Sequence, residues 1–109
     1  MPPTQAPGEL TAVAIAVLNG GAVAQVVVDE RTECFARLHA DGAWSGWWPV
    51  TGGVSAVSVA ADAGQDEASA LIAVVVLVPV PVGTHAVAHT LHQAVFYRLT
   101  PDGVSSVGL

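Results

Sequence analysis

The segment DGAWSGWWPVTGG, residues 41–53, holds all three tryptophans of the chain. An indole offers a large apolar face and one N–H donor, so Trp44, Trp47 and Trp48 suit either of two roles. They can pack a repeated β structure, or they can form a flat platform for a ligand. Because neighbouring strand residues point to opposite faces, Trp47 and Trp48 cannot both face inward. We therefore expect one indole to anchor the structure and another to be exposed. The candidate ligand-binding residues are Trp44, Trp47, Trp48, Glu33, Arg37 and His39.

The histidines and the single cysteine are the other groups with possible chemistry. His85, His89 and His92 are spaced H-x3-H-x2-H, which on a helix could ligate zinc. The flanking residues favour a strand, on which His92 faces away from the other two, so we predict no metal site. Cys34 has no partner for an internal disulfide and is expected to be a small buried hydrophobe.

Catalytic and nucleic-acid functions have no support in the sequence. The chain lacks a G-x-S-x-G motif, a phosphate-binding glycine loop and paired carboxylates at matching positions, so we expect no enzyme and no cofactor. Its net charge is −6, its only cations are Arg31, Arg37 and Arg98, and it has no lysine. That balance disfavours binding to a phosphate backbone. Arg37 and Arg98 are instead expected to pair with Asp41, Asp102 or Glu33, or to contact a ligand.

Two internal sequence matches predict a repeat. FARLHADGAWSG (35–46) aligns with FYRLTPDGVSSV (96–107) at an offset of 61, which superimposes Arg37 on Arg98. LTAVAIAVLNG (10–20) aligns with VSAVSVAADAG (54–64) at an offset of 44. The basic unit is therefore 44 residues long, and the second copy carries 17 additional residues.

Each repeat divides into four short strands separated by turn residues, and the valine density disfavours helix. The expected strands are 10–18, 23–29, 33–39 and 43–50, then 54–61, 70–78, 94–100 and 104–107. A four-stranded antiparallel unit of this length has the size of a β-propeller blade. We thus predict an all-β chain with a flexible tail (1–9), a first blade (10–53) and a second blade (54–109). The additional residues lengthen one hairpin of the second blade, around 78–93.

The D-G-x-W-S-x-W motif followed by Gly52 and Gly53 resembles the blade signature of tectonin-type and related bacterial β-propeller lectins. The sequence TEC (32–34) ahead of a D-G turn is also similar to two-blade fucose-binding propeller lectins. The resemblance implies shallow sugar sites between neighbouring blades, formed by an indole face and polar side chains. The second repeat has no tryptophan, and the second strand offers Gln25 where the fucose-binding group has an arginine.

Composition predicts self-association. Hydrophobic residues make up 52% of the chain and charged residues only 11%, less than half the usual share. A domain of 109 residues buries too little surface to hide so much apolar area alone. Two blades also cannot close a ring, so we expect a homo-oligomer, with a six-bladed trimer favoured. The longest apolar run, 70–83, contains two prolines and is too short to span a bilayer, so no membrane insertion is expected.

Two functions are therefore expected from the sequence. The first is a carbohydrate-binding propeller module that acts as an oligomer. The second is a non-catalytic assembly subunit that keeps the blades and binds protein partners instead of sugar. No signal peptide is recognised at the N-terminus, so a cytoplasmic location and non-classical export are both consistent with the sequence.

Overall fold

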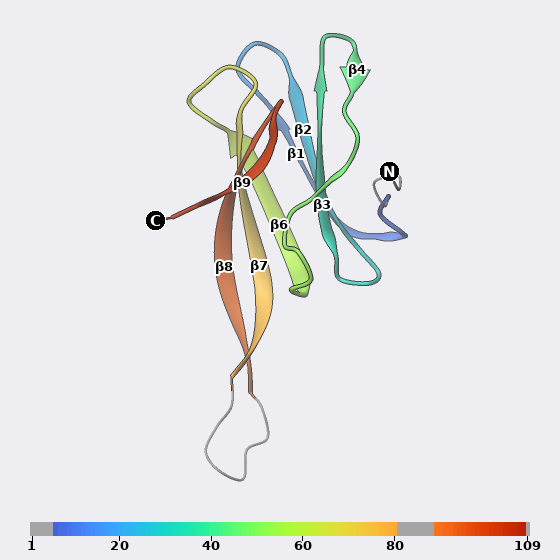
Figure 1. The fold of residues 1–109 in the computed structure, drawn as a ribbon, viewed down its shortest axis with the longest axis vertical. Coiled ribbons are helices and arrows are strands. Elements are labelled where there is room, and N and C mark those ends of the chain that lie inside the picture. The colour runs from blue at the N-terminus through green and yellow to red at the C-terminus, as the bar shows by residue number, and fades with distance from the viewer. Residues whose placement is uncertain (1–5, 81–88, 109) are drawn as a thin grey trace.

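The computed structural model describes residues 6–80 and 89–108, and within them the chain forms two antiparallel β-sheets and no helix (Figure 1). The all-β prediction is confirmed. The first sheet contains β1 (Leu10–Val17), β2 (Val23–Asp29), β3 (Cys34–Ala40), β4 (Ala43–Trp44) and β5 (Trp48–Pro49). The second contains β6 (Ala56–Ala63), β7 (Ala70–Val80), β8 (His89–Thr100) and β9 (Gly103–Val107). In the described part of the chain no helix is long and apolar enough to cross a membrane.

Each sheet is a simple meander in which consecutive strands pair, as the turn residues predict. The expected strand at 43–50 is the exception, because it is divided into β4 and β5. Both pieces pair with β3, but their registers differ by one residue: His39 lies opposite Trp44, whereas Ala36 lies opposite Trp48. At the break, the Leu38 amide donates to the Ser45 hydroxyl (3.0 Å), and the Ser45 amide donates to the Leu38 carbonyl (2.7 Å). The resulting bulge changes, between Trp44 and Trp47, which residues of this segment face each side of the sheet.

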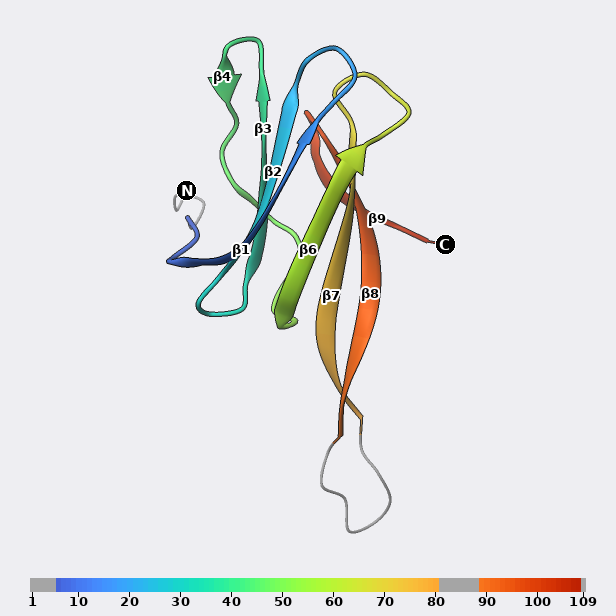
Figure 2. The ribbon, with the colours of Figure 1, turned by 180° about the vertical axis from the view of Figure 1, so that it is seen from behind.

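The core lies between the two sheets. Along β2 and β7 alternate residues turn toward the other sheet and are buried there, namely Ala24, Val26 and Val28 on β2 and Ala70, Ile72, Val74 and Val76 on β7. Val27 of β2 and Phe35 of β3 are also buried, although they lie on the other face of the first sheet. Contacts between the sheets are concentrated where β1 and β2 meet β6, and they become sparse farther out, between β3 and β8. Figure 2 shows β1 and β6 side by side and running in the same direction. The sheets therefore form a wedge, closed at β1 and β6 and open toward β4 and β9.

The second sheet carries the longest hairpin. β7 and β8 pair continuously from Ala70–Leu99 to Val80–His89, so the additional residues of the second repeat extend these two strands. The predicted extension, around 78–93, lies only partly within the described residues, which do not include 81–88. His89 and His92 belong to a strand, as expected, and His85 is not among the described residues.

The structural register corrects one sequence match. In the β3–β4 turn Ala40 pairs with Ala43, so the two turn residues are Asp41 and Gly42. In the β8–β9 turn Thr100 pairs with Gly103, so the two turn residues are Pro101 and Asp102. The sequence match at an offset of 61 would have placed them at Asp102 and Gly103. The matching positions of β3 and β8 are therefore 60 residues apart rather than 61. Arg37 and Arg98 do not occupy equivalent positions, and the residue equivalent to Arg37 is Tyr97.

Candidate functional site

The outward face of the first sheet gathers most of the polar and aromatic candidates. Strand alternation places Arg37 and His39 on this face of β3, and the strand pairing sets Gln25 of β2 opposite Arg37. On the other side of β3, Trp44 lies opposite His39. We call Arg37, His39, Trp44 and Trp47, together with Gln25, the tryptophan–arginine cluster. The structure thus brings together four of the six residues that the sequence predicted.

Arg37 is the centre of the cluster. Its guanidinium carbon lies 4.1 Å from the centroid of the Trp44 ring and 4.4 Å from that of Trp47, within cation–π range of both. Its Nε donates a hydrogen bond of 2.7 Å to Oε1 of Gln25. His39 meets Trp44 edge to face, with ring centroids 5.0 Å apart. Gln25, which stands on the second strand where the fucose-binding lectins have an arginine, therefore orients Arg37.

The expected ion pair of Arg37 is not formed within the described residues, where both ion pairs belong to Arg31. The Arg31 guanidinium lies 2.9 Å from Asp29 and 3.7 Å from Glu33. The Arg37 guanidinium lies instead among two aromatic rings and the amide of Gln25. The cluster is therefore a cationic, aromatic patch on a chain whose net charge is −6.

Trp48 faces the opposite side, as strand alternation predicts. It packs against the core, and a side-chain carbon added to Gly103 of β9 would meet its Nε1 at 3.6 Å. Trp44 remains 44% exposed. The indoles thus divide between packing and exposure. Between them lies a shallow hollow of about 250 Å³, lined by Leu38, Ala40, Ala43, Trp44, Ser45, Trp48 and Pro101. Pro101 belongs to the second sheet, so the hollow opens at the mouth of the wedge.

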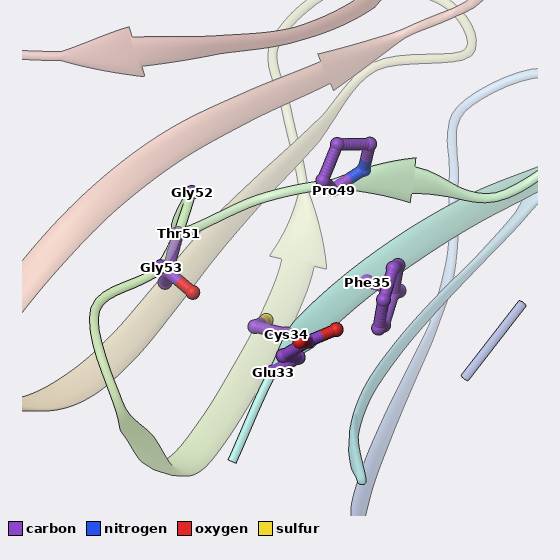
Figure 3. A pocket seen from close by; sticks show the side chains of 7 residues that line it. All are labelled: Glu33, Cys34, Phe35, Pro49, Thr51, Gly52 and Gly53. Carbon is purple, nitrogen blue, oxygen red and sulfur yellow. The ribbon is translucent and has the colours of Figure 1, made fainter. Parts of the chain in front are cut away.

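Glu33 does not join the tryptophan–arginine cluster. It precedes β3 at the end opposite His39, and it lines a separate pocket of about 240 Å³ (Figure 3). The other lining residues are Cys34, Phe35, Pro49, Thr51, Gly52 and Gly53. The separation follows from strand geometry, because Glu33 and His39 are six positions apart on an extended chain that rises about 3.3 Å per residue.

Asp29 is a buried polar residue that the sequence analysis did not single out. Its side chain is fully buried at the β2–β3 turn. It accepts hydrogen bonds from the backbone amides of Gly8, Arg31 and Glu33 at 3.0–3.1 Å and from the Arg31 side chain. Burial by itself raises the pKa of this carboxyl, but the hydrogen bonds outweigh it, so the pKa lies below its ordinary value. The one sequence signal for a buried carboxylate is the position of Asp29 at the end of the apolar strand β2.

Cys34 is buried in the core, which confirms the prediction of a small buried hydrophobe. Burial raises the pKa of its thiol to about 12. Because only the thiolate is nucleophilic, we expect iodoacetamide at pH 8 to alkylate the folded chain at least about a hundredfold more slowly than the chain in urea. Mass spectrometry of timed samples measures both rates. Equal rates in buffer and in urea would contradict the burial of this thiol.

Comparison with known protein families, characterised proteins and solved structures gives no match to this chain. Within residues 6–80 and 89–108, no group of three or more histidine, cysteine, aspartate or glutamate side chains could hold a metal ion. The functional argument therefore rests on the tryptophan–arginine cluster, the hollow beside it and the faces of the two sheets.

Proposed function

We propose that this chain is a carbohydrate-binding module of the propeller-lectin type that works as a homo-oligomer. The sugar binds at the hollow beside Trp44 and Trp48, and copies of the chain associate through their open sheet faces. Under this proposal each sheet is one blade, and the trimer with six blades is the favoured assembly.

The exposed indole of Trp44 is the observation that carries the sugar proposal. An indole face stacks on the apolar face of a sugar ring, while nearby polar groups bond its hydroxyls. Trp44 is 44% exposed, and Ser45 lies beside it in the lining of the hollow, whereas Arg37 and His39 contact Trp44 from the outward face of the sheet. The hollow of about 250 Å³ lies below the usual range of about 300–1,000 Å³ for drug-sized ligands, so it suits one sugar ring.

The assembly half of the proposal is supported by exposed apolar side chains. Val13, Ile15 and Val17 of β1 are 48%, 62% and 72% exposed on one face, and Leu71 of β7 is 40% exposed on another. Contiguous apolar surface of this kind typically marks a protein–protein contact. Native mass spectrometry at micromolar concentration should give a closed homo-oligomer, and a monodisperse monomer would contradict this half.

Replacing Trp44 by alanine should weaken retention on immobilised sugars about tenfold, the equivalent of about 1.4 kcal/mol, because the stacking surface is lost. Leu91→Ala is the matched control, since Leu91 is an exposed apolar residue of β8, 54% accessible and distant from the hollow. Retention on a panel of neutral and acidic sugars, with tryptophan fluorescence as a second readout, measures the effect. A wild-type chain that binds no member of the panel would overturn the sugar proposal.

A non-catalytic assembly subunit is the second candidate, and one observation favours it. The Arg37 guanidinium lies over the rings of both Trp44 and Trp47, so it occupies indole surface that a sugar would otherwise use. In that case the cluster stabilises the outer strands, and Trp44→Ala changes the stability of the chain without any glycan effect.

A further inference from the structure

The two sheets leave one open face each, and these faces differ in the size of their side chains. On the first sheet the open face of β1 presents Val13, Ile15 and Val17. On the second sheet the open face is lined near β6 by small residues, Ser58 and Ala60, with Ala73 beside them on β7. A hollow of about 300 Å³ lies there, lined by Ala60, Ala61, Asp62, Leu71, Ala73 and Phe96. A ridge of branched side chains thus lies on one face, and a hollow lined by apolar residues together with Asp62 lies on the other.

The interface within the chain already joins faces of these two kinds. Near β1 the core face of the first sheet is formed by small residues, Ala14 and Ala16 on β1 and Ala24 on β2, whereas the rest of this face includes Val26, Val28 and Leu38. The second sheet packs larger side chains against it, with Val59 on β6 and Ile72 and Val74 on β7. Complementary sizes of this kind let two sheets approach closely without cavities.

The direction of the innermost strands explains why the pattern recurs. Because β1 and β6 run the same way side by side, the second sheet is related to the first by a rotation about an axis along these strands (Figure 2). Such a rotation carries the inward face of the first sheet onto the outward face of the second. The strand pairing agrees: the last pair of β1–β2, Val17–Val23, matches the last pair of β6–β7, Ala63–Ala70, an offset of 46 rather than the 44 of the sequence match. The inward Ala16 therefore corresponds to the exposed Asp62.

We propose that a second copy of this chain docks head to tail, with the hollow at Ala60, Leu71 and Ala73 of one copy receiving the Val13–Ile15–Val17 ridge of the other. The inference rests on the assembly half of the proposed function and identifies its two surfaces. The contact is heterologous, because each copy uses a different face. A copy in the middle of the assembly therefore uses both faces, and the series ends only when a ring closes.

This docking leaves the sugar hollow accessible. Within the chain, inter-sheet contacts concentrate at β1, β2 and β6 and become sparse toward the outer strands. A second copy that docks in the same way covers the β1 ridge and leaves Trp44, on β4, at the open mouth of the new wedge. Assembly and sugar binding therefore use separate parts of the same sheet.

Two single-face variants test the proposal. Ile15→Glu places a charge on the ridge, and Ala60→Glu places one in the hollow; both positions are exposed in a single chain, so both variants should fold. Each variant alone should have the mass of one chain in native mass spectrometry. An equimolar mixture should form a discrete 1:1 dimer, because Ile15→Glu keeps an intact hollow and Ala60→Glu keeps an intact ridge. Gln65→Glu, which adds the same charge in the exposed β6–β7 turn, should assemble like the wild type.

Several results would overturn head-to-tail docking. They are a monomeric wild-type chain, a variant series in which only Ile15→Glu dissociates the assembly, and a mixture that remains monomeric. The second result would instead indicate a symmetric contact between two ridges. Sugar retention by the same samples is measured separately, so a chain that assembles as proposed but binds no sugar contradicts only the carbohydrate half of the proposed function.

Discussion

Replacing Asp29 by alanine is expected to lower the free energy of unfolding by about 3 kcal/mol. The fully buried carboxylate accepts hydrogen bonds from the amides of Gly8, Arg31 and Glu33, and its removal leaves these three partly buried donors without their acceptor. The partly exposed Arg31 side chain adds little of this effect, since solvent screens its charge. Urea denaturation followed by circular dichroism measures the loss. Glu30→Ala, at an exposed position of the same turn, is the control and should change stability by less than about 0.5 kcal/mol.

The same carboxylate predicts how stability depends on pH. The pKa of Asp29 is depressed in the folded state, so its contribution is fully present above the unfolded pKa, about 4, and is lost as pH falls through the lower folded value. The stability difference between the wild type and Asp29→Asn should therefore be largest near neutral pH and should shrink below about pH 4. A difference that stays constant from neutral to strongly acidic pH would contradict a depressed pKa.

Replacing Trp48 by alanine is expected to cost about 3 kcal/mol of unfolding free energy, at the lower end of the range for core tryptophans, because the indole is only partly buried. Its ring packs against the core and lies beside Gly103 of the second sheet, so its loss opens a cavity between the sheets. Thermal and urea unfolding of the variant measure the cost.

Trp44→Ala is the matched comparison for Trp48→Ala. Trp44 is exposed on β4, and its replacement should change stability by less than about 1 kcal/mol while it weakens sugar retention. Equal destabilisation by the two substitutions would contradict the division between a packing tryptophan and an exposed one.

Much of the fold could be predicted from the sequence because its signals are local. The turn sequences at 19–21 and 41–42, together with the valine-rich runs between turns, located most strands to within one or two residues. Strand alternation alone predicts that Trp47 and Trp48 face opposite sides of the sheet. The burial of Cys34 followed from its place within an apolar strand. These inferences need only the period of a strand and the conformations that turn residues adopt.

The composition of the tryptophan–arginine cluster could not be predicted from the sequence, because it depends on how strands distant in the sequence pair. The pairing of β2 with β3 decided that Gln25, not an acidic residue, would hold Arg37. The bulge at Ser45 decided that Trp44 and Trp47 would both contact the Arg37 guanidinium, and strand length separated Glu33 from both. The one-residue difference between the β3–β4 and β8–β9 turns decided that Arg98 would not repeat the role of Arg37.

The sequence by itself thus determined that the chain is a set of antiparallel strands with an excess of apolar surface and an aromatic cluster beside one turn. Only the tertiary structure decided which face of each sheet is covered and which stays open, which arginine is paired and which is stacked, and that an aspartate at a turn would become a buried hydrogen-bond acceptor. The physical reason is that a side chain changes face with every residue of a strand. A single bulge or a one-residue shift in a turn, invisible in composition and weak in a sequence match, therefore moves every following side chain to the other surface of the sheet.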